Sequence, residues 1–254
     1  MWDVRGLAAV PRFPHGPCLT YLGHVSQSPL SSSPPLFSLA ARSRIALFGG
    51  SFDPVHRAHL EVARRAGLVF GLDRVIFTPA ATPPHKLGKE LAPGGARLAM
   101  LERATAGVAS WEVSDAELRR EGTSFTVDTL RSLGARYGAD EAVQLFMIIG
   151  SDNLPGLPGW KDVEEVLTLA KPIVAWREGS PDEHLAALEG RLPASLVERL
   201  STGFLRLPPV PGSATELRAR LAAGHSLSDE LPEGVHDVIV SEGLYGIESR
   251  EASA

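Results

Sequence analysis

The sequence predicts an α/β fold built on a doubly wound parallel sheet in a single domain. Two observations predict it. Short apolar runs alternate with stretches of helical spacing, and small, hydroxyl-bearing and basic residues recur in the loops after those runs. Strands that alternate with helices indicate a parallel sheet covered on both faces. Since ligands of such sheets bind at the carboxyl ends of the strands, the same loops are the place to look for a site.

Residues 1–43 differ in composition from the rest of the 254-residue chain. They contain six prolines, seven serines and three glycines, and no stretch of them keeps a helix or strand period. Such a composition is typical of disorder. We therefore expect a disordered Pro/Ser-rich extension over 1–43, one domain over 44–246 and a tail over 247–254. The scarcity of acidic residues in the extension would also suit a transit peptide, and a start codon assigned too far upstream is the other explanation.

Six short runs rich in apolar and β-branched residues predict strands. Gly49 and Gly50 end the first run, Pro79 stops the second, and the run over 143–149 is the clearest buried strand. The predicted strands cover 44–48, 74–78, 108–113, 143–149, 172–176 and 204–207.

Apolar residues at helical spacing fill most of the intervals between these runs. The predicted helices cover 60–70, 96–106, 127–137, 162–170, about 215–223 and about 235–242. Because a helix follows most of the strands, the expected arrangement of the sheet is Rossmann-like.

The composition excludes several classes of protein. No apolar run approaches the roughly 18 residues that span a bilayer, so no membrane association is expected. The one cysteine, Cys18, excludes an internal disulfide and a Cys-based zinc site, and it suits the reducing cytoplasm. A net charge of −5 argues against a broad nucleic-acid surface. A few local cations can still bind a small phosphate ligand.

The loop after the first predicted strand carries the most specific pattern. Its two glycines allow backbone N–H groups to approach an anion with no Cβ in the way. The pair Asp53-Pro54 favours a turn that opens a helix. His56 and His59 are three residues apart, so they share a face of the first helical turn and can donate hydrogen bonds to phosphate oxygens. The alternatives are an ordinary pair of surface histidines and a metal site, for which no third ligand is evident nearby.

This loop resembles the signature of the HxGH nucleotidyltransferase superfamily, and specifically that of the bacterial nicotinate-nucleotide adenylyltransferase family. The family pattern is Gly-Gly-(Ser/Thr)-Phe-Asp-Pro-(Ile/Val)-His-x-Gly-His-Leu. Residues 49–60 match it except at Ala58, which replaces a glycine. The resemblance covers nearly the whole chain after residue 43. Its further segments are 78–86, 123–130, 149–154 with Trp160, 213–218 (where Ala214 replaces a serine) and 243–245.

The resemblance implies transfer of AMP from ATP to nicotinate mononucleotide, which gives nicotinate adenine dinucleotide and pyrophosphate in NAD biosynthesis. The acceptor phosphate is already ionised, so the reaction needs positioning and charge stabilisation instead of a general base or a covalent nucleophile. Three catalytic residues are expected. His59 would stabilise the α-phosphate, His56 would hold the β- or γ-phosphate, and Arg218 would grip the leaving pyrophosphate with its planar fork.

The same resemblance implies the remaining site residues and the partners. The residues expected to bind ATP are Gly49, Gly50, Ser51, Phe52, Asp152, Arg177, Ser213 and Thr215. The residues expected to bind the mononucleotide are His85, Lys86, Ser124, Thr126 and Trp160. Mg²⁺ is expected on the ATP phosphates with few protein ligands. ATP and nicotinate mononucleotide are the expected partners, with no nucleic acid and no membrane, and a homo-oligomer remains open.

Three other functions are alternatives. A related adenylyltransferase would use nicotinamide mononucleotide or phosphopantetheine, although enzymes of the latter kind typically carry Thr at the position of His56 and lack the Trp160 segment. A catalytically inactive nucleotide sensor would use the same pocket, and Ala58 and Ala214 leave room for it. An NAD-dependent dehydrogenase would need Gly-x-Gly-x-x-Gly after the first strand, and residues 49–54 do not provide it.

Overall fold

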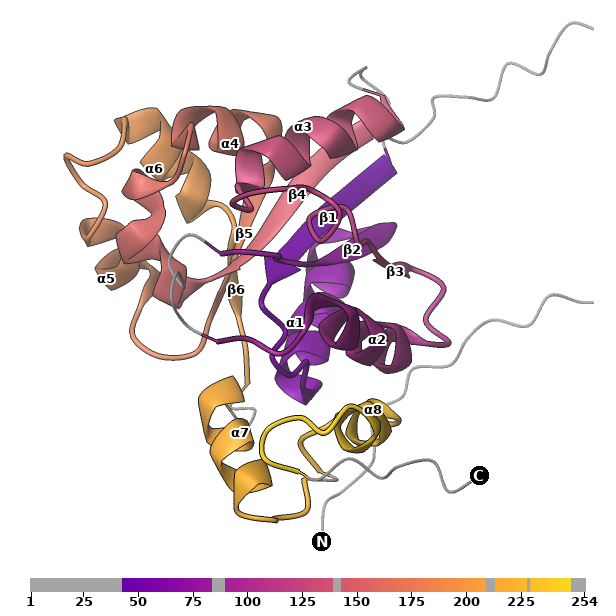
Figure 1. Cartoon of the computed structure of the whole chain (residues 1–254). Helices are drawn as coiled ribbons and strands as arrows, with labels where there is room; N and C mark the ends of the chain where they lie inside the picture. The colour runs from indigo at the N-terminus through magenta and orange to yellow at the C-terminus, as the bar shows by residue number, and fades with distance from the viewer. Residues whose placement is uncertain (1–42, 84–89, 139–142, 209–212, 228, 248–254) are drawn as a thin grey trace, which may run out of the picture. The chain divides into compact units, whose positions relative to one another are not determined.

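Six strands form the sheet at the centre of the structure, a computed structural model that describes residues 43–83, 90–138, 143–208, 213–227 and 229–247. Their order is β3-β2-β1-β4-β5-β6 and every neighbouring pair is parallel (Figure 1). The doubly wound α/β prediction is therefore confirmed. The expected extension lies, apart from its last residue, outside the described residues, and so does most of the expected tail.

Five of the six predicted strands are present within about two residues of their expected ends. The strands are β1 (Ser43–Gly50), β2 (Arg74–Pro79), β3 (Trp111–Val113), β4 (Val143–Gly150), β5 (Lys171–Trp176) and β6 (Phe204–Arg206). The prediction was wrong for 108–110, which do not belong to β3. There the N–H of Val108 donates to the carbonyl of Thr105 and the N–H of Trp111 donates to that of Val108, so the backbone turns just before β3. The carbonyl of Ser110 already accepts the N–H of Val75 in β2.

Each predicted helix is present, and the structure adds three helical segments that the sequence analysis missed. The α-helices are α1 (Arg57–Phe70), α2 (Gly94–Thr105), α3 (Thr126–Tyr137), α4 (Val163–Leu169), α5 (Pro181–Ala186), α6 (Ala194–Ser201), α7 (Ala214–Ala222) and α8 (Val235–Ser241). The missed segments are α5, α6 and the 3₁₀ helix η2 (Ser151–Gly159), which contains two prolines. The start of α5 carries a signal in the sequence, because Ser180 and Glu183 form a capping box.

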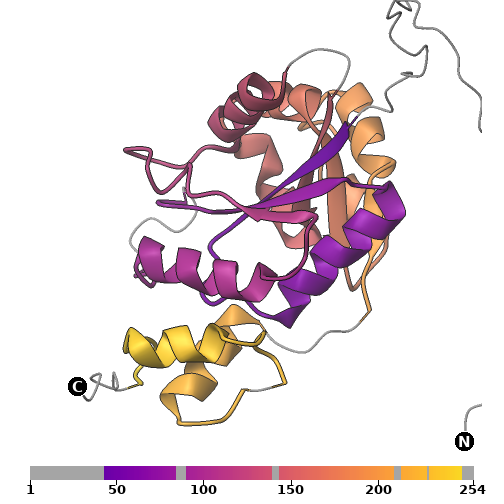
Figure 2. The same cartoon turned by 90° about the vertical axis from the view of Figure 1, so that its right-hand side faces the viewer.

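Both faces of the sheet are covered by helices, which explains why its strands read as nearly continuous apolar runs. Along β1, Ala46 and Phe48 point into one hydrophobic core and Ile45 and Leu47 into the other. Helices α1, α2, α7 and α8 supply the first core, and α3, η2 and α4 supply the second (Figures 1 and 2). Figure 2 shows α7 and α8 in a layer beyond α1 and α2.

The order of the strands places a topological switch point between β1 and β4. From β1 the chain passes to α1 on one face, and from β4 it passes to η2 and α4 on the other. Ligands of open α/β sheets bind in the crevice at such a point, outside the carboxyl ends of the strands. Over the part of the chain that the structure describes, no helix combines the length and the apolar character needed to cross a membrane.

Candidate active site

The two glycines that end β1 have different surroundings. A Cβ added to Gly49 would meet no atom within 4 Å, so the backbone at this position borders open space. A Cβ added to Gly50 would lie 3.2 Å from the ring of Phe52. Gly49 therefore leaves room for a ligand to approach the backbone, whereas Gly50 makes room for the aromatic ring that follows.

Phe52 places a buried aromatic ring on a left-handed backbone. Its φ is 49° and its side chain is 2% exposed. The ring packs edge-on against His59, with centroids 5.1 Å apart, and against Phe48 at 5.6 Å. Residues other than glycine rarely adopt this backbone region, and those that do cluster at functional sites. Burial of the ring thus fixes the shape of the loop between β1 and α1.

His56 and His59 lie together at the N-terminus of α1, which begins at Arg57 and not at the Asp53-Pro54 turn. Their ring centroids are 3.9 Å apart and the rings are tilted by 35°. The backbone N–H of His56 donates to Nδ1 of His59 at 3.3 Å. Because Nδ1 accepts this bond, the neutral ring of His59 carries its proton on Nε2.

His56 is neutral at pH 7. Burial, and to a smaller extent the positive charge of Arg177, lowers the pKa of its imidazole from 6.5 to about 4. Its Nδ1 is buried and has no hydrogen-bond partner among the described residues. Such an atom costs about 1–3 kcal/mol, and in native proteins it often marks a functional site. His56 therefore offers a ligand hydrogen bonds, and the imidazole of His59 lies beside it.

Arg218 reaches the same loop from α7, near the other end of the chain. Its Nη1 donates to the carbonyl oxygen of Asp53 at 2.6 Å and lies 3.6 Å from Oδ2 of the same residue. Asp53 comes three residues before His56, so the guanidinium and the two imidazoles lie at one edge of the sheet. Arg218 stands in the second turn of α7. Its side chain is about one-third exposed, so a ligand can reach it.

The other residues predicted to bind ATP lie in loops or in the first turn of helices around this edge. Arg177 follows β5, is exposed, and lies close enough for its charge to act on His56. Asp152 is exposed in η2, directly after β4. Ser213 caps α7 through its side-chain oxygen, and Thr215 accepts a hydrogen bond from Arg218 in the next turn.

On the predicted acceptor side, Ser124 holds the loop that follows β2. Its Oγ accepts the N–H groups of Ala81 at 3.0 Å and of Thr82 at 3.4 Å, and its side chain is buried. It also hydrogen-bonds to the buried Glu117. Thr126 begins α3 and is half-buried. Ser124 is thus bonded within the protein, whereas Thr126 is the more accessible of the two.

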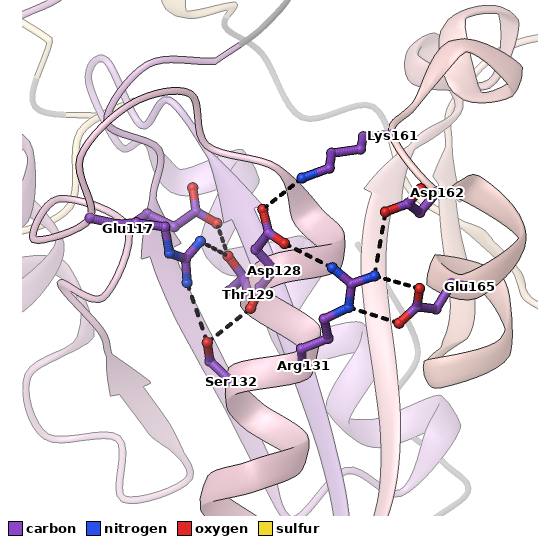
Figure 3. Close-up of polar contacts among 9 residues, drawn as sticks. Glu117, Asp128, Thr129, Arg131, Ser132, Lys161, Asp162 and Glu165 are labelled. Carbon is purple, nitrogen blue, oxygen red and sulfur yellow. Dashed lines mark hydrogen bonds and ion pairs between the residues drawn. The ribbon is translucent and has the colours of Figure 1, made fainter.

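Trp160 follows η2 and packs, half-buried, against the core beneath α3 and α4. The next residue, Lys161, lies over the ring of Phe125, 4.7 Å from its centroid. Arg131 joins α3 to α4 through two hydrogen bonds to Glu165 (Figure 3). The contact between Lys161 and Phe125 brings the chain that follows η2 next to the start of α3, where Ser124 and Thr126 lie.

Three buried polar residues near the site escaped the sequence analysis. Asp53 was assigned only to a turn, yet its carboxylate is 3% exposed and accepts the hydroxyl of Tyr245. Glu117 is 6% exposed and accepts Oγ1 of Thr129 at 2.6 Å (Figure 3). Arg97 is 2% exposed on α2. Of these three residues, only Arg97 could have been recognised as buried from the sequence, because it stands where the helical spacing of α2 calls for an apolar side chain.

Two predicted residues, His85 and Lys86, lie outside the described residues. Ala58, which departs from the family pattern, is 2% exposed, so its methyl group packs against the protein's own atoms. Within the described ranges, no group of three or more His, Cys, Asp or Glu side chains could hold a metal ion.

Comparison with known proteins gives one consistent result. The model of the cytidylyltransferase-like family matches residues 47–220. A protein of Desulfitobacterium hafniense (strain DSM 10664 / DCB-2) is 37% identical over 209 residues, which is 82% of this chain and 98% of that protein. A protein of Roseiflexus sp. (strain RS-1) is 39% identical over 202 residues, which is 79% of this chain and 97% of that protein. Each is named a probable nicotinate-nucleotide adenylyltransferase.

Solved structures share the fold at lower identity. The Plasmodium falciparum nicotinic acid mononucleotide adenylyltransferase complexed with NaAD superposes with a TM-score of 0.61 at 17% identity, covering 82% of this chain and 99% of that one. The same enzyme complexed with APC superposes with a TM-score of 0.58 at 16% identity, and it covers the same shares of the two chains. At these identities the likeness shows the fold.

Proposed function

Because the chain belongs to the nicotinate-nucleotide adenylyltransferases of the cytidylyltransferase-like family, we propose that it transfers AMP from ATP to nicotinate mononucleotide. The products are nicotinate adenine dinucleotide and pyrophosphate. The observation that carries this proposal is the meeting of His56, His59 and Arg218 at the carboxyl end of β1.

The reaction is an in-line displacement at phosphorus. An oxygen of the mononucleotide phosphate attacks the α-phosphorus of ATP, and the bond from that phosphorus to the bridging oxygen of the β-phosphate breaks. The bonding electrons leave with pyrophosphate. Since the attacking oxygen already carries negative charge at pH 7, the protein contributes positioning and stabilisation of charge.

His59 is the residue that stabilises the reacting phosphate. Its Nδ1 accepts the N–H of His56, which holds the imidazole in place and leaves the ring proton on Nε2 as the proposed donor. A preorganised donor aimed at developing charge lowers the barrier without the cost of reorganisation. His56, neutral and buried, binds the β- or γ-phosphate through hydrogen bonds.

Arg218 binds the leaving pyrophosphate. Its Nη1 is anchored on the carbonyl of Asp53, and its exposed remainder can form hydrogen bonds to phosphate oxygens. Arg177 adds a second positive charge on the same edge of the sheet. These two cations offset the overall charge of −5 where the triphosphate would lie.

Trp160 and Thr126 form the acceptor site. The indole offers a flat face on which the pyridinium ring can stack. Ser124 contributes indirectly, because its hydroxyl fixes the loop after β2. His85 and Lys86 lie outside the described residues, so their contact with the mononucleotide phosphate stays a prediction.

Mg²⁺ accompanies ATP in this proposal and is held by phosphate oxygens and water. The site fits this mode of binding, because Asp53, the buried carboxylate next to the phosphate loop, is already bonded to Tyr245, Ala92 and Arg218. When bound, the ion neutralises charge on the phosphates. We also place the reaction in the cytoplasm, as the single cysteine suggests.

The proposal is tested by pyrophosphate release from ATP with separate acceptors, and the dinucleotide product is identified by mass spectrometry. Turnover with nicotinate mononucleotide well above that with nicotinamide mononucleotide is the expected result. Faster turnover with nicotinamide mononucleotide or phosphopantetheine would assign the chain to a sibling enzyme. ATP binding without pyrophosphate release from any acceptor would make it a nucleotide sensor.

A further inference from the structure

Arg97 occupies a position on the buried face of α2 where the helical spacing calls for an apolar side chain. It shares that face with Met100, Leu101 and Ala104, and only 2% of it is exposed. Taking a guanidinium out of water is costly unless its donors are well satisfied. The partners of Arg97 therefore indicate what its burial achieves.

Its donors reach three separate segments of backbone. Nη1 donates to the carbonyl oxygen of Ser51 at 2.9 Å and to that of Ala80 at 2.8 Å, while Nε donates to that of Ala92 at 2.8 Å. Ser51 lies in the loop after β1, on the predicted phosphate path. Ala80 lies in the loop after β2, on the predicted acceptor side. One guanidinium thus joins the two loops that would hold the two substrates.

These bonds fix the orientation of whole peptide units, because a trans peptide is planar and its C=O and N–H point in opposite directions. The carbonyl of Ala80 points to Arg97, and the N–H on the other side of that peptide, from Ala81, donates to Oγ of Ser124 at 3.0 Å. Arg97 and Ser124 therefore hold one peptide unit from its two ends. In the same way, the carbonyl of Ser51 points to Arg97, so the N–H of Phe52 in the same peptide unit points away from Arg97.

The charge of Arg97 is balanced by a residue of the same site. Asp53 is the carboxylate that interacts with its guanidinium electrostatically, and the carbonyl of Asp53 accepts Nη1 of Arg218. A change at Arg97 would therefore be transmitted to the phosphate loop, to the acceptor loop and to the anchor of Arg218.

We propose that Arg97 is a positioning residue that sets the spacing between the phosphate loop after β1 and the acceptor loop after β2. This inference rests on the proposed function, since it assigns the two loops to the two substrates. Arg97 acts through the backbone of Ser51 and Ala80 and touches neither substrate.

The experiment compares Arg97→Met and Arg97→Lys with Met100→Ala, a core truncation on the same face of α2. For each variant, kcat, KM for ATP and KM for nicotinate mononucleotide are measured below its Tm, together with the Tm itself. Arg97→Met is expected to lower kcat/KM by about 10²-fold, because a displacement of about 1 Å in a substrate-positioning group has that effect. Both KM values should rise. Arg97→Lys has one donor nitrogen and should show a smaller loss in the same direction.

Met100→Ala should lower the Tm and leave kcat and both KM values unchanged. If the Arg97 variants behave in this way too, Arg97 has a structural role only and the proposal is wrong. Arg97→Lys decides the question if Arg97→Met does not fold. Calorimetric titration with ATP is run in parallel. If the wild-type protein binds ATP but transfers no AMP, the proposed function fails. In that case the positioning role of Arg97 is still tested by binding. Weaker ATP binding by the Arg97 variants than by the wild type supports this role, and unchanged ATP binding overturns it.

A double-mutant cycle tests the peptide that Arg97 shares with Ser124. Arg97→Lys weakens the hold on the carbonyl of Ala80, and Ser124→Ala removes the acceptor of the N–H of Ala81. Because both changes act on the same peptide unit, their effects on KM for the mononucleotide should not multiply. The double variant is expected to lose less than the product of the two single losses. Fully multiplicative losses would contradict a common action on this peptide.

Discussion

The hydroxyl of Tyr245 and the carboxylate of Asp53 are 192 positions apart in the sequence, and Oη lies 2.7 Å from Oδ1 in the structure. This bond fastens the segment after α8 to the loop after β1. Asp53 also accepts the N–H of Ala92 on the same oxygen and lies beside Arg218 on the other. A buried carboxylate is thus satisfied by groups from three distant parts of the chain, and the anchor of Arg218 depends on all of them.

Tyr245→Phe removes the hydroxyl and leaves that oxygen of Asp53 with fewer donors. We expect the free energy of unfolding to fall by about 1–3 kcal/mol, as measured by urea denaturation. We also expect kcat to fall, because the carbonyl that anchors Arg218 belongs to the same residue. Tyr137→Phe is the matched control, since it removes a hydroxyl bond to Glu112 away from the site and should leave kcat unchanged. Unchanged stability and kcat in Tyr245→Phe would contradict this role of the bond.

His59→Ala removes the Nε2–H donor proposed for the α-phosphate. We expect kcat to fall by about 10²–10³-fold, as on loss of a preorganised donor in an oxyanion hole. His225→Ala, which alters an exposed histidine after α7, is the control and should match the wild type. Pyrophosphate release measures both variants. A loss of less than tenfold in His59→Ala would contradict the assigned role.

The stability of the fold should fall between pH 6.5 and pH 4 because of His56. Its pKa is lowered to about 4 in the folded protein, so the unfolded chain binds more protons than the folded one within this window. The free energy of unfolding therefore decreases as the pH falls across this window, by about 3 kcal/mol in all. His56 is the N-cap residue of α1, so His56→Asn puts a residue type that is favoured at this position there and removes the titration. Urea denaturation at several pH values should show a shallower dependence in this variant, and an equal slope would count against a buried, neutral His56.

Trp160→Leu separates stacking from packing. Leucine keeps an apolar side chain against the core beneath α3 and α4 but removes the flat aromatic face. We expect KM for nicotinate mononucleotide to rise while KM for ATP and the Tm change little. Leu157→Ala serves as the packing control, because it empties a fully buried position in the same core and should lower the Tm instead. A fall in Tm with no change in KM for Trp160→Leu would show that the indole has only a packing role.

Glu117→Gln should stabilise the protein at pH 8. Burial raises the pKa of Glu117 even though Thr129 and Ser124 hydrogen-bond to it. The folded protein then binds more protons than the unfolded chain, so the contribution of Glu117 to stability decreases as the pH rises. Glutamine keeps an acceptor oxygen for Thr129 and carries no charge. The Tm of the variant should exceed that of the wild type at pH 8, and the difference should shrink toward pH 4. A Tm of Glu117→Gln below that of the wild type at both pH values would contradict this prediction.

Much of the fold was predictable because the pattern that encodes it is local. Strand β4 is a run of apolar residues that is buried on both faces, and the spacing of Ala58, Val62 and Ala66 along α1 is helical. Where local signals conflict with the spatial arrangement, prediction failed. Residues 108–110 were predicted to belong to a strand, yet Val108 takes part in two turn hydrogen bonds, with Thr105 and with Trp111, and β3 begins only at Trp111.

The candidate site was predictable to the extent that it lies in contiguous motifs. His56 and His59 were found because two imidazoles at helical spacing after a glycine pair form a rare local pattern. Asp53 and Glu117 were missed because a single acidic residue in a loop does not reveal whether its side chain is buried. Arg97 was missed although it stands at an apolar position of the helical spacing, because a charged residue there can also be solvent-exposed.

The sequence by itself determined the alternation of strands and helices, the loops that carry polar residues and the family to which the chain belongs. These properties follow from the period of apolar residues and from short motifs, both of which a linear sequence records. The tertiary structure alone decided that Tyr245 and Arg218 meet at Asp53, that His56 stays neutral, and that Arg97 joins two loops. Each of these depends on burial and on distances between remote residues, which arise only once the chain has packed.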